Sequence, residues 1–230
     1  MGYRIRVYRH HGSVFFAIFG LLLTAIVVFL LIGATGIAFQ RLGFSRLQVV
    51  LILVGTFVGA SVNIPLWHVK RLKKVLDTEE VQFFWITYRI PRIKVEEVST
   101  LIAINLGGAL IPSVVSLYLL STHLQAIPYA LLGVLLTAIV VHLVARRVPG
   151  LGIATPAFIP PIAAALAAYI LAPSAPNIIA YVSGTLGTLI GADLTNLRGI
   201  GELRTPMASI GGAGTFDGVF LAGVIAVILV

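Results

Sequence analysis

Val14–Phe39 reads VFFAIFGLLLTAIVVFLLIGATGIAF and contains no charged side chain. A helix that crosses the hydrocarbon core of a bilayer needs about 20 mostly apolar residues, and this run is longer than that. Arginines precede it, as in a signal peptide, but its apolar core is about twice the length of a signal-peptide core and no clean small-residue cleavage site follows. The stretch therefore predicts a retained membrane anchor.

The composition of the whole chain agrees with this prediction. Of the 230 residues, 59% are hydrophobic and 10% are charged, whereas soluble domains carry about 25% charged residues. The mean hydropathy is +1.05. The formal charge of +8 does not require a nucleic-acid partner, because basic residues gather in the cytoplasmic loops of membrane proteins. The absence of cysteine excludes disulfides, thiol nucleophiles and cysteine-based metal sites.

Seven apolar segments are candidates for membrane spans. The sequence predicts an all-α polytopic membrane protein, with one transmembrane domain over residues 1–230 and several helices broken by Gly and Pro. The predicted spans are Val14–Phe39, Leu47–Trp67, Ser99–Ser121, Ala126–Ala145, Ile153–Leu171, Asn177–Leu194 and Met207–Val230.

The distribution of Lys and Arg predicts the orientation of these spans. If the N-terminal segment 1–13 is cytoplasmic, then the loop 68–98 and two later loops are cytoplasmic as well, and together they hold fourteen of the sixteen basic residues. This asymmetry predicts a multi-pass plasma-membrane protein with its N-terminus inside and its C-terminus outside. The lipid bilayer is the expected partner, and the oligomeric state stays open.

Two polar segments on the predicted cytoplasmic side have the patterns of strands. Tyr3–Arg9 alternates apolar and basic residues. Val81–Ile90 is rich in β-branched and aromatic residues and is followed by Pro91, which is expected to end it. The two segments could pair in a small cytoplasmic β-sheet, or they could be basic interfacial segments held by anionic lipid.

Ionisable side chains are few within the predicted spans. His142 precedes Arg146 by one turn and is expected at the membrane interface. Asp193 and Asp217 flank a loop that is predicted to be cytoplasmic, so on antiparallel helices their carboxyl groups would lie at similar depth. Two facing carboxylates in a medium of low dielectric constant share a proton near neutrality.

Glycines surround both aspartates and permit close approach of helices. In the run GGAG before Asp217, backbone N–H groups could be free to bind an anion or a peptide carbonyl. The residues expected to support the aspartate pair are Gly191, Gly211, Gly212, Gly214 and Thr215.

A second polar group lies in the second and third spans. Asn beside Gly-Gly and Pro predicts a broken helix, the pattern by which transporters build sites at the membrane midplane. Each element could instead be a packed kink with a satisfied amide. Irregular backbone at membrane depth is tolerated only where it is buried in protein or lines a wet cavity, so together these residues favour an internal cavity. They are Asn63, Asn105, Gly107, Gly108 and Pro112.

Five stretches resemble an uncharacterised family of archaeal and bacterial membrane proteins, catalogued as domain of unknown function 1614. The resemblance runs from about Phe39 to the C-terminus and implies no activity. The stretches are Asn63–Trp67, Ile104–Leu120, Val144–Pro161, Tyr181–Leu197 and Ser209–Gly218.

A weaker resemblance is to the aspartyl intramembrane proteases, the relatives of presenilin, signal peptide peptidase and prepilin peptidase. These carry one Asp on a helix and another in a GxGD motif on a later helix, which implies the first role for Asp193 and the second for Asp217. The chain departs from the pattern: GAGTFD replaces GxGD, Ala192 stands where presenilins have Tyr, and Ile159–Pro161 is only suggestive of the Pro-Ala-Leu element.

Three functions remain open from the sequence. The two aspartates could be the catalytic pair of an intramembrane protease that acts on membrane peptides. They could instead bind a small cation or proton in a transporter or channel, with a divalent metal as a variant that no His or Cys strengthens. In a scaffold without catalytic activity, Asp217 would cap a helix or pair with Arg198 or Arg204. No dedicated metal site and no cofactor are predicted, because no nucleotide-binding motif is present.

Overall fold

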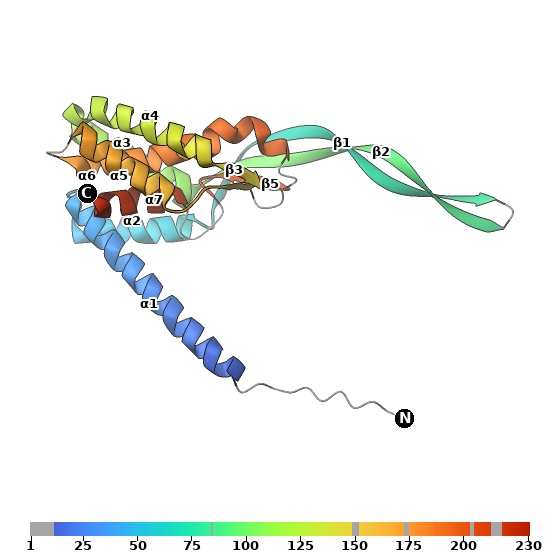
Figure 1. The fold of residues 1–230 in the computed structure, drawn as a ribbon, viewed down its shortest axis with the longest axis horizontal. Helices are drawn as coiled ribbons and strands as arrows, with labels where there is room; N and C mark the ends of the chain where they lie inside the picture. The colour runs from blue at the N-terminus through green and yellow to red at the C-terminus, as the bar shows by residue number, and fades with distance from the viewer. Residues whose placement is uncertain (1–11, 84, 149–151, 173–174, 203–204, 213–217) are drawn as a thin grey trace.

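The computed structural model describes residues 12–83, 85–148, 152–172, 175–202, 205–212 and 218–230. Within these ranges the chain is mostly helical, with a β-sheet at one end of a helix bundle (Figure 1). The α-helices are α1 (Gly12–Arg41), α2 (Arg46–Gly59), α3 (Ile111–Thr122), α4 (Ile127–Val144), α5 (Ile159–Leu171), α6 (Pro176–Val182) and α7 (Gly218–Leu229). The strands are β1 (Asn63–Phe83), β2 (Ile86–Asn105), β3 (Arg146–Val148), β4 (Gly152–Ala154) and β5 (Met207–Ile210). The π-helices are η1 (Leu106–Leu110), η3 (Ser183–Gly187) and η4 (Leu189–Asp193), and the 3₁₀-helices are η2 (Leu124–Ala126) and η5 (Leu194–Glu202).

Three helical stretches in the described part of the chain are long and apolar enough to cross a membrane. They are Phe16–Arg41, Leu124–Val144 and Pro176–Leu197, which match the first, fourth and sixth predicted spans. The other four apolar helices are shorter, between 10 and 17 residues. Helix length therefore supports a membrane protein but does not confirm seven crossings.

The prediction of an all-α chain was wrong for parts of four predicted spans. The segment Leu47–Trp67 leaves the helix after Gly59 and enters β1, and the segments that begin at Ser99, Ile153 and Met207 each begin in a strand. A short buried strand and a buried helix both appear in a sequence as a continuous apolar run, so periodicity does not separate them. The Gly and Pro content marked these segments as irregular without giving their conformation.

Strands β1 and β2 form a long antiparallel hairpin that extends from the bundle (Figure 1). Asn63 lies opposite Asn105 at its base, and Phe83 lies opposite Ile86 beside the turn. The small β-element predicted for this region is therefore present and larger than expected. The predicted strand Val81–Ile90 spans the turn, and Pro91 lies within β2 and does not end it. The other predicted strand, Tyr3–Arg9, lies outside the described residues.

Residues of opposite charge occupy paired positions in the backbone register of the hairpin, for example Lys73 with Glu96 and Asp77 with Arg92. Lys70 Nζ lies 2.9 Å from Glu97 Oε1, and opposite-charge pairs across strands are favourable. At the base, β5 joins β2 in parallel, with Leu101 paired to Met207. Three strands thus meet where the hairpin enters the bundle.

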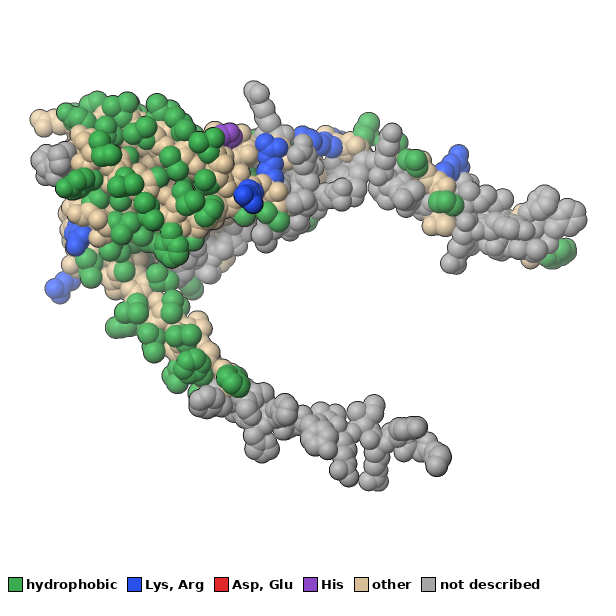
Figure 2. Space-filling view, in the orientation of Figure 1, with side chains coloured by type: hydrophobic (Ala, Val, Ile, Leu, Met, Phe, Trp, Pro, Cys, Tyr) green, Lys and Arg blue, Asp and Glu red, His purple; other side chains and the backbone are tan. Residues whose placement is uncertain are grey.

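The bundle has an aromatic centre and an apolar outside. The Phe39 ring, near the end of α1, lies 5.5 Å from the ring of Tyr181 and 6.2 Å from that of Phe220. Figure 2 shows hydrophobic side chains covering the visible face of the bundle, with Lys and Arg gathered where the bundle meets the hairpin. Monomeric soluble proteins rarely expose apolar patches of this extent, so this surface fits a lipid environment.

Candidate carboxylate site at the end of the bundle

Asp193 lies at the end of the helical stretch Pro176–Leu197, as its last π-helical residue. Its side chain is partly buried, and the backbone N–H of Gly211 donates a hydrogen bond to Oδ2 at 2.6 Å. A carboxylate that accepts from a backbone N–H forms one of the stronger hydrogen bonds in proteins. In the GGAG run, the Gly211 N–H is therefore engaged by the Asp193 side chain within the protein.

The conformation of the run requires glycine. Gly211 has φ +82° and Gly212 has φ +74°, in the left-handed region that other residues rarely adopt. Gly211 also presses against η1, because a Cβ added to it would lie 2.5 Å from the Ala109 Cβ and 2.7 Å from the Ala109 nitrogen. Neither the backbone angle nor the available space admits a side chain there.

The second predicted group is a hydrogen-bonded cluster at the base of the hairpin. The Asn105 side chain is fully buried; its Nδ2 donates to the Ala60 carbonyl at 2.8 Å and to Asn63 Oδ1 at 3.1 Å. Its Oδ1 accepts from the Gly108 N–H at 2.7 Å, which caps η1. Ser209 of β5 donates to the same Asn63 oxygen at 2.6 Å. This cluster corresponds to the alternative of satisfied amides at a break in the helix.

Glycine packing joins η1 to its neighbours. A Cβ on Gly59 of α2 would lie 3.0 Å from the Gly107 nitrogen, so the two backbones nearly touch. Pro112 is buried in the first turn of α3, and its carbonyl accepts from Ser116 Oγ at 2.9 Å.

The two predicted groups are parts of one site. Ser209 bonds to Asn63, and Gly211, two residues further on, contacts Ala109 of η1 and bonds to Asp193. The β5 strand and the turn after it therefore link the asparagine cluster to the carboxylate. Periodicity and composition could not show this link, because β5 was predicted as helix.

Gly191 supports the site from the opposite side. A Cβ on this residue would lie 2.9 Å from the Val141 Cβ and 3.0 Å from the Ala138 Cα, so η4 packs tightly on α4. Two side chains after Asp193 bond back to this turn: Thr195 Oγ1 donates to the Gly191 carbonyl at 2.7 Å, and Asn196 Nδ2 donates to the Ala192 carbonyl at 2.8 Å.

His142 of α4 and Arg147 of β3 complete this support, a role that the sequence did not predict for either residue. His142 Nδ1 lies 2.8 Å from Thr195 Oγ1. Because the Thr195 hydroxyl donates to a carbonyl, His142 Nδ1 is the donor in this pair. Arg147 Nε donates to Asn196 Oδ1 at 3.2 Å. His142 is exposed, as expected for an interfacial residue, but it also fixes the turn that carries Asp193.

Three predicted site residues, Gly214, Thr215 and Asp217, lie outside the described residues. Both flanks of that segment are described. Gly211 bonds to Asp193, and Val219 belongs to the same cluster of buried apolar side chains as Leu189, one turn before Asp193. Both flanks of the segment are therefore connected to the part of the chain around Asp193, Gly211 by a hydrogen bond and Val219 through the buried cluster.

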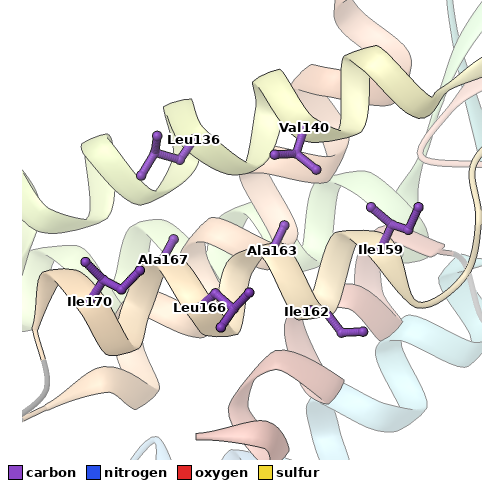
Figure 3. A pocket seen from close by; sticks show the side chains of 8 residues that line it. All are labelled: Leu136, Val140, Ile159, Ile162, Ala163, Leu166, Ala167 and Ile170. Carbon is purple, nitrogen blue, oxygen red and sulfur yellow. The ribbon is translucent and has the colours of Figure 1, made fainter.

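The pockets of the bundle surface lie elsewhere. An apolar groove of about 400 Å³ runs between α4 and α5, with Ala163 and Ala167 between larger aliphatic side chains (Figure 3). A second pocket of about 560 Å³, which includes His123, Gln125 and Tyr129, lies where α4 begins. Neither is lined by Asp193, so the cavity expected beside the aspartates is not provided by these two pockets.

One family model matches residues 57–229, from α2 to the end of α7, and its description is "Protein of unknown function (DUF1614)". The match includes every residue of the site described above. No curated protein and no solved structure matches the chain, so the resemblance to aspartyl intramembrane proteases rests on its two short motifs alone. Because the match covers well over half of the chain, the protein belongs to the DUF1614 family of proteins of unknown function.

Proposed function

We propose that Asp193 is the chemical centre of the protein and that it forms, with Asp217, the proton-sharing carboxylate pair of an intramembrane protease. The observation that carries the proposal is the hydrogen bond from the Gly211 N–H to Asp193 Oδ2, at 2.6 Å. This bond ties the sixth apolar segment to the glycine run that leads into Asp217. Val219 and Leu189 belong to one cluster of buried apolar side chains, which supports the same placement from the other flank.

The proposed chemistry is that of an aspartyl pair. One ionised carboxylate accepts a proton from water as the water oxygen attacks the scissile carbonyl carbon, while the protonated partner donates its proton to the carbonyl oxygen. In the resulting gem-diol intermediate the C–N bond then breaks: the amine takes the proton from the carboxyl group that had accepted it from water, and the other carboxylate takes a proton from a gem-diol hydroxyl, which restores the pair and leaves a carboxylic acid. The substrate class is a peptide segment within or beside the membrane, because the bundle around Asp193 is apolar on its outside.

For the membrane, we propose that all seven apolar segments enter the bilayer, four of them as short helices continued by extended or π-helical backbone. The basic hairpin, β3 and η5 lie at one end of the bundle, where β2 pairs with β5 and Arg147 bonds to Asn196. Arg41 bonds to Val227 at the other end, near the C-terminus. The positive-inside rule then places the hairpin end in the cytoplasm and the C-terminus outside.

The test is peptide-bond cleavage by purified protein in detergent or nanodiscs, with transmembrane peptides as substrates. Removing a general acid or base lowers catalysis by about 10²–10⁴-fold, so Asp193→Asn and Asp217→Asn should each lose at least about 100-fold. Glu97→Gln is the matched control, because Glu97 is an exposed carboxylate of the hairpin that pairs with Lys70. Cleavage that survives either Asn variant would refute the proposed pair.

A proton- or cation-coupled transporter is the second candidate. It is favoured by the interruption of the third apolar segment at Asn105, where a strand passes into a π-helix and then into α3. Transporters use such discontinuous elements at their binding sites. Flux into proteoliposomes that follows an imposed gradient, and that changes in Asp193→Asn, would favour this candidate; failure of both cleavage and flux would leave a scaffold.

A further inference from the structure

The helical stretch that carries Asp193 changes its periodicity before it reaches that residue. Two π-helices, η3 and η4, follow α6 with only Thr188 between them. π-helices are rare and occur frequently at functional sites. Their i→i+5 turn brings residues five apart onto successive turns, whereas in an α-helix such residues diverge by roughly 140°.

Three polar residues, Ser183, Thr188 and Asp193, follow one another at intervals of five along this stretch. Ser183 is 0% exposed and Thr188 is 2% exposed, and the hydroxyl oxygen of each has no hydrogen-bond partner among the described residues. A buried hydroxyl without a hydrogen-bond partner destabilises the folded state. The stretch before Asp193 therefore carries two buried hydroxyl groups that have no hydrogen-bond partner in the described part of the chain.

The neighbouring helix adds to this column of hydroxyl groups. Thr137 of α4 is also fully buried, and its hydroxyl has no partner in the described part of the chain. Thr137 packs on Gly187, where an added Cβ would lie 2.6 Å from the Thr137 Cβ, and Ser183 packs on Gly133. Glycine on one helix thus makes room for a hydroxyl of the other. We call Thr137, Ser183 and Thr188 the hydroxyl column.

We propose that the hydroxyl column binds internal water and conducts protons between the interior of the bundle and Asp193. Water fits the chemistry, because each hydroxyl can both donate and accept and a buried water needs two to four polar partners. The described residues of the column include no charge that would hold an ion, and an apolar ligand would leave the hydroxyls unpaired.

In the proposed transfer, the Asp193 carboxyl gives its proton to a neighbouring water, and each following oxygen gains one O–H bond and loses another. No group is consumed, so the column can work in both directions. The proposal rests on Asp193 as the chemical centre of the proposed function, but it holds for a protease and for a transporter, since both must change the protonation of this residue.

The experiment measures proton release from Asp193 by infrared spectroscopy after a pH jump, in protein reconstituted in nanodiscs. The carboxyl band of Asp193 is assigned by its loss in Asp193→Asn. Thr188→Val removes the hydroxyl at nearly constant shape, Thr188→Ser retains it, and Ser183→Ala gives a second test at another position. Ser116→Ala is the control, because Ser116 is buried but already donates to the Pro112 carbonyl.

We expect Thr188→Val and Ser183→Ala to slow proton release by at least about fivefold, which corresponds to the free energy of one ordinary hydrogen bond. We expect Thr188→Ser and Ser116→Ala to release the proton at the wild-type rate. A wild-type rate in both Thr188→Val and Ser183→Ala would overturn the proposal. A raised melting temperature at unchanged rate would also overturn it, since it would identify hydroxyls that are buried dry. The measurement needs no cleavage activity, so slowed release in a protein that cuts no peptide would refute the protease and keep the column.

Discussion

Replacing Gly211 with alanine perturbs the residue that joins the glycine run to Asp193. The new Cβ would meet the Ala109 Cβ at 2.5 Å, the Ala109 nitrogen at 2.7 Å and the Ala109 Cα at 2.9 Å. It would also sit on a backbone with φ +82°. A non-glycine residue in the left-handed region costs about 1–2 kcal/mol, and overpacking costs about 1–3 kcal/mol more.

The control for this substitution is Gly43→Ala. Gly43 has φ +89°, close to that of Gly211, but nothing lies within 4 Å of its added Cβ. The control therefore measures the cost of the backbone angle alone. We expect Gly211→Ala to lower the free energy of unfolding by about 2–5 kcal/mol and Gly43→Ala by about 1–2 kcal/mol.

The assay is reversible unfolding in mixed detergent and dodecyl sulfate, followed by circular dichroism. The difference between the two variants reports the contact of Gly211 with η1. Equal losses of stability would show that Gly211 does not press on Ala109, and the link between the carboxylate and the asparagine cluster would then be refuted.

Further predictions concern the cluster, the helix packing and the topology. Asn105→Ala removes three hydrogen bonds of a buried amide and should lower the free energy of unfolding by about 2–4 kcal/mol in the same assay. Its control is Asn177→Ala, which removes one exposed hydrogen bond of 3.4 Å and should cost less than about 1 kcal/mol. Similar losses in the two variants would contradict the described burial of Asn105. Gly187→Leu should destabilise the protein by about 1–3 kcal/mol or more, because a Cβ there already lies 2.6 Å from Thr137, and an unchanged melting temperature would speak against π-helical packing on α4. Because the chain has no cysteine, the single variants Thr78→Cys and Ser121→Cys test the membrane orientation. A membrane-impermeant thiol reagent added to intact cells should label Ser121→Cys and leave Thr78→Cys unlabelled. The reverse labelling pattern would show the opposite orientation.

The sequence alone located the apolar segments, because apolar length depends on composition and not on conformation. It placed the change at Asn105 correctly as a break, since Asn, Gly-Gly and Pro disfavour continuous helix. It did not predict that the backbone before Asn105 is extended. That conformation depends on pairing with β1 and β5, which lie far apart in the sequence, and no local pattern encodes such pairing.

The residues of the candidate site were predicted from the sequence only in part, because the contacts between them depend on backbone conformation. Asp193 and the glycine run were both singled out, but their hydrogen bond follows from the left-handed turn at Gly211, which composition permits without requiring it. The hairpin register had a usable signal in the order of charges from Lys70 to Glu97: basic, acidic, basic and acidic groups follow one another, and groups of opposite charge are paired when the chain folds back near Trp85. The hydrogen bond between Arg147 and Asn196 had no signal in the sequence, because it depends on the contact between β3 and η5, which no local pattern of residues indicates.

The most direct test of the account is the separation of the residues at positions 193 and 217. In the cysteine-free chain, the double variant Asp193→Cys/Asp217→Cys can form a disulfide only if the two Cα atoms lie within about 7 Å. Asp193→Cys/Thr78→Cys serves as a control with the second thiol on the hairpin. We predict rapid disulfide formation in the first pair under mild oxidation and none in the second. If both thiols of the first pair react with alkylating reagents but never with each other, the proposed carboxylate pair is contradicted.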